Sequence, residues 1–127
     1  MTLALVGTLG AGKTQLVRFL AEALGAPPES VTSPTYVLHQ RYAGRSPMDH
    51  FDFYRLDAPA QVWDLGIDEL YERPGLVVIE WADKFPECLP DDHLQIHLET
   101  SSGTARTARL TPTGPRATQL LQCLQSG

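Results

Sequence analysis

The residues from Gly7 to Thr14 have the types and spacing of a phosphate-binding loop. Their sequence, GTLGAGKT, matches the pattern G-x-x-x-x-G-K-[ST]. In such a loop the backbone N–H groups surround phosphate oxygens, the lysine reaches the β- and γ-phosphates, and the final hydroxyl coordinates Mg²⁺. A glycine-rich turn with an unrelated lysine is the alternative. The residues expected to contact the nucleotide here are Gly7, Leu9, Gly10, Ala11, Gly12, Lys13, Thr14 and Gln15, with Lys13 also a catalytic candidate and Thr14 a metal ligand.

Two carboxylates, Asp52 and Glu80, are candidates for holding the metal ion and for orienting a water that attacks the nucleotide. Glu80 ends the apolar run at residues 76–79, where proteins with this loop place an acidic residue. Asp52 falls on the polar face of a strand whose other face carries phenylalanines. The alternatives are a solvated strand-end carboxylate for Glu80 and an ion pair with Arg55 or Arg41 for Asp52. Which of the two carboxylates contacts Mg²⁺ directly stays open at this point.

Other side chains near these motifs could also contact the nucleotide. Ser33 and Thr35 flank a proline on a loop, where a hydroxyl can sense the γ-phosphate and Mg²⁺ as in a nucleotide switch. An ordinary proline turn is the alternative. Trp81 could cover the nucleotide or pack in the core. We expect His50 to be a structural histidine rather than a catalytic one.

The elements that must position these residues follow from hydrophobic periodicity. Continuous apolar runs at residues 3–6 and 76–79 predict strands that are covered on both faces of a parallel sheet. Alternating apolar and polar residues predict further strands over residues 36–42, 48–55, 93–100 and 106–111, with the last two forming a hairpin. Helical spacing predicts a helix between Gly12 and Gly25, two short helical turns over residues 58–71 broken at Gly66, and a terminal helix over residues 115–125.

Composition limits the function classes. The 127 residues, 43% of them hydrophobic, suit one globular domain, and a net charge of −5 argues against a general electrostatic grip on nucleic acid. Any contact with RNA would be local or through a partner. The two cysteines show no C-x-x-C spacing, so we expect reduced thiols. Because no segment has the length of a membrane span or the features of a signal peptide, we expect a cytoplasmic protein without membrane contact.

Five motifs, taken together and in order, resemble the TsaE (YjeE) family of bacterial ATPases. That family acts in making threonylcarbamoyladenosine at position 37 of tRNAs that read ANN codons. The resemblance extends from about Leu3 to Leu98. The motifs are GTLGAGKT at residues 7–14, SPTY at 33–36, HFDFYRL at 50–56, GIDEL at 66–70 and VVIEWADK at 77–84.

The resemblance implies an α/β P-loop NTPase domain over residues 1–127, three-layered, with a mixed parallel and antiparallel central sheet. It implies binding of ATP and Mg²⁺ within a complex with the TsaB and TsaD proteins. TsaD transfers the threonylcarbamoyl group, so this chain would meet tRNA only indirectly, and its ATP turnover would reset the complex. The positions that match the family's functional residues are Lys13, Thr14, Ser33, Thr35, Asp52, Glu80 and Trp81.

The sequence departs from the family pattern at two places near its start. Only six residues precede Gly7, where family members usually have a helix and a strand. Either the start of the sequence is truncated or misassigned, or this version of the domain lacks those elements. Thr8 stands where an aspartate is usual, which removes a negative charge beside the phosphates.

Two other functions suit a short chain with a phosphate-binding loop. A kinase for small molecules or nucleosides would need an acceptor pocket and usually an arginine-bearing lid, whereas the arginines here are scattered without a lid segment. A nucleotide-gated binding module would turn over slowly or not at all. Because no arginine finger is evident, we expect weak hydrolysis by the isolated chain.

Overall fold

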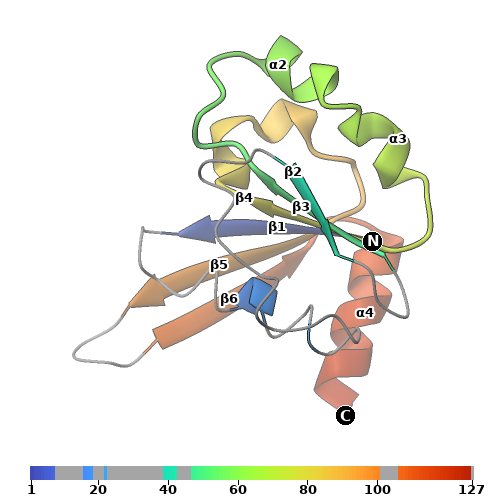
Figure 1. The fold of residues 1–127 in the computed structure, drawn as a ribbon. Coiled ribbons are helices and arrows are strands. Elements are labelled where there is room, and N and C mark those ends of the chain that lie inside the picture. Colours follow the sequence, from blue (N-terminus) through green and yellow to red (C-terminus); the bar gives the residue numbers. More distant parts are fainter. Residues whose placement is uncertain (8–15, 19–21, 23–38, 43–46, 101–105, 127) are drawn as a thin grey trace.

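A six-stranded sheet forms the centre of the computed structural model, which describes residues 1–7, 16–18, 22, 39–42, 47–100 and 106–126 (Figure 1). The strand order is β2-β3-β4-β1-β5-β6. The strands are β1 (Thr2–Gly7), β2 (His39–Tyr42), β3 (Met48–Asp52), β4 (Leu76–Glu80), β5 (Leu94–Thr100) and β6 (Arg106–Pro112).

The sheet is mixed, as predicted. The four inner strands β3, β4, β1 and β5 are parallel, and β2 and β6 pair antiparallel at the two edges. The apolar runs became β1 and β4, the two central strands, because only a strand covered on both faces can be apolar throughout. The predicted hairpin is confirmed as the β5–β6 pair.

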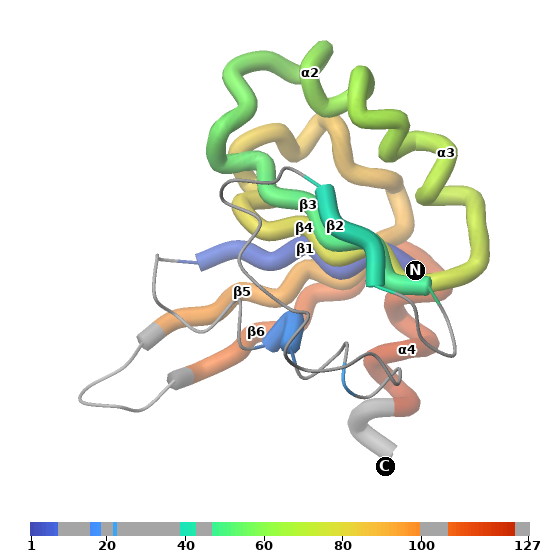
Figure 2. Tube along the Cα trace, in the orientation of Figure 1, coloured from blue at the N-terminus to red at the C-terminus, as the bar shows by residue number. Residues whose placement is uncertain are grey.

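Helices cover both faces of this sheet and give the expected three layers (Figures 1 and 2). One face carries α2 (Pro59–Asp64), α3 (Ile67–Tyr71) and the short 3₁₀ turns η2 (Ala82–Lys84) and η3 (Pro86–Cys88). The other face carries α4 (Pro115–Ser126) and the helical residues 16–18. Gly66 separates α2 from α3 with a left-handed backbone (φ 75°), which confirms the predicted break.

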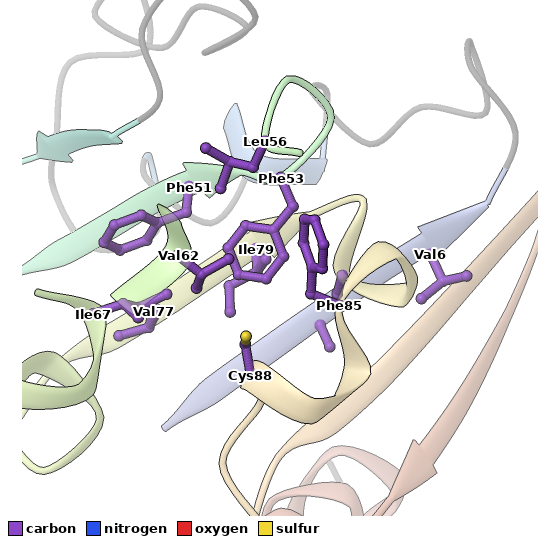
Figure 3. Close-up of a cluster of buried hydrophobic side chains, with 12 residues drawn as sticks. Val6, Phe51, Phe53, Leu56, Val62, Ile67, Val77, Ile79, Phe85 and Cys88 are labelled. Atoms are coloured by element: carbon purple, nitrogen blue, oxygen red, sulfur yellow. The ribbon is translucent and has the colours of Figure 1, made fainter. Parts of the chain in front are cut away.

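Each face has its own apolar cluster. On the face of α2 and α3, Phe51 and Phe53 pack with Ile79 and with the buried, free thiol of Cys88 (Figure 3). On the opposite face, Val17 packs with side chains of the sheet and of α4, including Ala117. The sheet is therefore fixed from both sides.

One expected strand is shorter in the structure, and another is described only in part. The strand predicted over residues 48–55 ends at Asp52, because the Asp52 carboxylate accepts the backbone N–H of Tyr54 (2.8 Å) and turns the chain. The strand predicted over residues 36–42 is seen over 39–42, and residues 36–38 lie outside the described part.

None of the described helices has the length and apolar character needed to cross a bilayer.

Candidate functional site

The carboxyl ends of β1, β3 and β4 meet at one edge of the sheet, because these strands are parallel. At this edge Asp52 pairs in register with Glu80, and Glu80 pairs with Leu5 of β1. Side chains in register on neighbouring parallel strands share a face of the sheet, so both carboxylates lie on the face that carries Val17. Gly7 ends β1 two residues after Leu5 and begins the predicted phosphate-binding loop.

Glu80 is a buried carboxylate, with 4% of its surface exposed. Its Oε2 lies 2.8 Å from Nε2 of His50, a side chain that is itself completely buried. Its backbone carbonyl accepts the N–H of Phe53 (3.1 Å), which extends the β3–β4 pairing past the end of β3. Glu80 is thus held on both its side chain and its backbone, unlike the solvated strand-end carboxylate considered as an alternative.

Asp52 is buried to the same degree, with 3% exposed. One of its oxygens, Oδ1, accepts the N–H of Tyr54. Arg41, one of the two arginines considered as a partner for Asp52, instead lies 4.0 Å from Asp49. The site therefore has two buried carboxylates, opposite each other on adjacent strands.

Gly7 can only be a glycine in this backbone. Its φ is +148°, and a Cβ added there would lie 2.1 Å from the carbonyl oxygen of Leu98 on the neighbouring β5. The chain therefore passes very close to β5 as it leaves the sheet. The other residues predicted to contact the nucleotide or the metal lie outside the described residues, namely Leu9, Gly10, Ala11, Gly12, Lys13, Thr14, Gln15, Ser33 and Thr35.

Trp81 follows Glu80 with a left-handed backbone (φ 58°, ψ 36°), a conformation that is unfavourable for a residue with a Cβ. Its ring centroid lies 5.0 Å from that of Tyr54, whose side chain is exposed. Lys84 donates from Nζ to the backbone carbonyl of Tyr54 (2.6 Å). Trp81 is also packed against the apolar cluster on the face of α2 and α3, so its ring lies at the border of the core, the alternative considered for it from the sequence.

Sequence reasoning missed the parts played by His50, Tyr54 and Lys84. The contact between His50 and Glu80 depends on the register of β3 against β4, which no local pattern reveals. Tyr54 and Lys84 belong to motifs already noted, HFDFYRL and VVIEWADK, but nothing in the spacing of these motifs indicates that the two residues meet.

The oxygen donors at this edge suit Mg²⁺. Magnesium sites usually use one or two protein carboxylates and complete the shell with waters and substrate phosphates. Asp52 and Glu80 supply two buried carboxylates in register on adjacent strands, the kind of oxygen ligand that Mg²⁺ takes from proteins. In the described part of the chain, no group of three or more His, Cys, Asp or Glu side chains is placed to hold a metal by itself. The site therefore fits a metal that is shared with a bound phosphate.

Comparison with known proteins points to one family. A family model described as "Threonylcarbamoyl adenosine biosynthesis protein TsaE" matches residues 1–108. The chain is 36% identical over 121 residues to the "tRNA threonylcarbamoyladenosine biosynthesis protein TsaE" of Bacillus subtilis, covering 94% of this chain and 75% of that protein. It is 40% identical over 94 residues to the protein of the same name from Treponema pallidum, covering 74% and 69%. A crystal structure of Bacillus subtilis YdiB superposes with a TM-score of 0.80 at 32% identity, over 98% of this chain and 76% of that one.

Proposed function

This chain belongs to the TsaE family, whose members are named for threonylcarbamoyladenosine biosynthesis in tRNA, and we propose that it is a magnesium-dependent ATPase of that process. It acts with TsaB and TsaD in the modification of position 37 of tRNA. Binding and hydrolysis of ATP reset the complex between cycles.

One observation carries most of this proposal. Asp52 and Glu80 are buried in register at the carboxyl ends of parallel strands, beside the strand that ends at Gly7. In open parallel sheets, ligands bind at the carboxyl ends of the strands. Burial of two carboxylates is unfavourable unless they are neutralised, so a site that keeps both is suited to a metal ion and a polyphosphate.

The proposed reaction is the attack of water on the γ-phosphorus of ATP. A new P–O bond forms, the bond from the γ-phosphorus to the β,γ-bridging oxygen breaks, and ADP and phosphate are released. Glu80 orients the water and accepts its proton. Lys13 neutralises charge on the β- and γ-phosphates. Thr14, Asp52 and Glu80 are the candidate ligands of Mg²⁺, which, when bound, neutralises phosphate charge.

The remaining nucleotide contacts are assigned from the matching family positions. The backbone of residues 7–15 surrounds the phosphates, and the hydroxyls of Ser33 and Thr35 respond to the γ-phosphate. Trp81 follows the proposed catalytic carboxylate in sequence, and its assignment as a nucleotide contact rests on the matching family position alone.

The charge of the chain is consistent with an indirect role toward tRNA. A net charge of −5 gives little general attraction to a phosphate backbone, so contact with tRNA is through TsaB and TsaD. TsaD performs the group transfer in this scheme, and the chain described here supplies the nucleotide cycle.

Calorimetric titration of the folded chain with MgATP, followed by phosphate-release assays with and without TsaB and TsaD, tests this function. We expect binding by the chain alone, slow release, and a rate at least tenfold higher when both proteins are present. Equal rates in the two conditions would contradict the assigned partners. Absence of binding would contradict the nucleotide site. ATP consumption that depends on an added metabolite would indicate a kinase, and binding without any phosphate release would indicate a binding module.

A further inference from the structure

We propose that His50 is a positioning residue for Glu80, acting through the hydrogen bond from its Nε2 to Glu80 Oε2. The inference rests on the proposed function, because it assigns to Glu80 the orientation of the attacking water. It concerns the orientation of the Glu80 carboxylate before the water attacks.

His50 lies at the end of an apolar row that crosses the parallel strands of the sheet. His50 is in register with Val78 of β4, Val78 with Leu3 of β1, and Leu3 with Leu94 of β5. These four side chains form one row across the face, and the other three are buried and apolar. The next row toward the carboxyl ends contains the two carboxylates. Among these four side chains of the parallel strands His50 is the polar one, and on its other side it is in register with the half-buried Gln40 of the edge strand β2.

The hydrogen bond fixes one of the two oxygens of Glu80. The proposed role of Glu80 as a base requires an ionised carboxylate, which can only accept, and Nε2 of His50 is then the donor in this 2.8 Å contact. Among the described residues, His50 is the side chain that donates to this carboxylate. Holding Oε2 sets the rotation of the carboxylate and leaves Oε1 available to a water or a metal ion. Geometry of this kind is what a general base requires.

The other ring nitrogen shows that stability alone does not explain a histidine here. Nδ1 of His50 is buried and has no hydrogen-bond partner among the described residues. An unsatisfied buried polar atom is destabilising, and an apolar side chain would avoid that penalty. Departures from the local pattern of this kind are expected where function requires them. The ring is completely buried, so solvent water does not reach it, and the ring of Tyr42 is a neighbour on the same face (centroids 6.5 Å apart).

The experiment compares three substitutions of His50 in the full chain, assayed with TsaB and TsaD. His50→Leu removes the donor. His50→Gln places an amide nitrogen near the position of Nε2, and His50→Asn places one near Nδ1, out of reach of Glu80. We expect His50→Leu and His50→Asn to lower kcat at least tenfold while the Kd for MgATP changes less than threefold. His50→Gln should recover at least a third of the lost rate.

A matched control is His39→Leu. His39 also pairs with a buried carboxylate, that of Asp49, but on the opposite face of the sheet (2.7 Å). We expect its kcat to stay within twofold of the unmodified chain.

The inference is wrong if His50→Leu retains the full kcat, or if His50→Gln and His50→Asn lose rate equally. If His50→Leu does not fold, the ratio of the kcat of His50→Gln to that of His50→Asn still tests whether a donor at the position of Nε2 is needed. If the unmodified chain neither binds nor hydrolyses ATP, the proposed function fails, which is a different result from an active chain that is indifferent to His50.

Discussion

The ammonium group of Lys84 donates to the backbone carbonyl of Tyr54 across 2.6 Å, and so joins the turn after β4 to the turn after β3. Both turns immediately follow a candidate catalytic carboxylate. The Lys84 ammonium also lies 5.8 Å from the centroid of the Tyr54 ring, within the range of a cation–π contact. One side chain thus couples the ends of the two strands that carry the site.

Substitution of Lys84 should loosen this connection. Lys84→Met keeps the aliphatic stem but loses the donor and the charge, and we expect the free energy of unfolding to fall by about 0.5–1 kcal/mol. Urea denaturation measures the change. Arg73→Ala is the control, because the Arg73–Glu69 pair is exposed (3.7 Å) and should contribute less. An equal fall in the free energy of unfolding of both variants would mean that Lys84 contributes no more than an exposed surface charge does.

Substitutions in the proposed catalytic set should separate binding from turnover. Glu80→Ala should retain ATP binding and lower phosphate release at least a hundredfold, because the water is no longer oriented. Lys13→Ala should lose binding, since a charge on the phosphates is no longer neutralised. Calorimetry and phosphate release, measured on the same preparations, check both. Hydrolysis that persists in Glu80→Ala would remove the catalytic role of Glu80.

Alanine at Gly7 should be far more disruptive than alanine at Gly66. Both glycines have a positive φ, but the new Cβ at position 7 would overlap the Leu98 carbonyl, whereas nothing lies within 4 Å at position 66. We expect the free energy of unfolding to fall by about 1 kcal/mol in Gly66→Ala, from the backbone conformation alone, and by about 3 kcal/mol or more in Gly7→Ala. The free energies are measured by guanidinium unfolding. Similar losses in the two variants would show that Gly7 does not approach β5 as closely as described.

The left-handed backbone of Trp81 predicts an inverted order for two truncations. Trp81→Ala and Trp81→Gly both lose the packing of the indole against Tyr54, but only glycine also relieves the conformation at φ 58°. Trp81→Gly should therefore be more stable than Trp81→Ala by about 1 kcal/mol, the reverse of the usual penalty for glycine. Thermal and chemical unfolding of the two variants decide the order.

Asp92 gives a pH-dependent contribution to stability. Its carboxylate accepts the backbone N–H groups of Ala117 (3.0 Å) and Arg116 (2.9 Å) in the first turn of α4. These hydrogen bonds, that of Ala117 foremost, lower the pKa of Asp92 below its usual 3.8. A lowered pKa in the folded state means that the stabilisation is present above about pH 4 and is lost as the pH falls through the folded-state value.

Asp92→Asn tests this, because an amide oxygen can still accept one N–H but does not titrate in this range. We expect the Tm of the unmodified chain to fall more steeply than that of Asp92→Asn between about pH 5 and pH 3. Parallel slopes would show that the other carboxylates account for the whole acid sensitivity.

Local patterns anticipated most of the elements. The apolar runs gave β1 and β4 because burial on both faces removes the need for polar residues, and the break at Gly66 followed from the conformational freedom of glycine. The end of β3 was placed too late, since the capture of the Tyr54 N–H by Asp52 interrupts an alternation that continues in sequence. The apolar runs and the glycine break were predictable because each is a property of a few consecutive residues.

The candidate site was predictable in its residues but not in its arrangement. Asp52 and Glu80 stood out as carboxylates at strand ends, yet their register depends on a parallel pairing between segments that are joined through two helices. The hydrogen bond of His50 to Glu80 and the left-handed backbone of Trp81 follow from that register and from close packing. Residue types therefore indicate the chemistry, whereas tertiary contacts determine which atoms meet.

The position of β1 between β4 and β5 has a consequence for how the chain acquires its structure. β1 is translated well before β4 and β5, its two hydrogen-bonding neighbours, so its apolar faces stay uncovered until those strands have been made. Pairings between such distant segments slow folding and leave nascent chains prone to association. Overproduction at low temperature or with a holding chaperone should raise the recovered yield, because the vulnerable period ends only when β5 has been made.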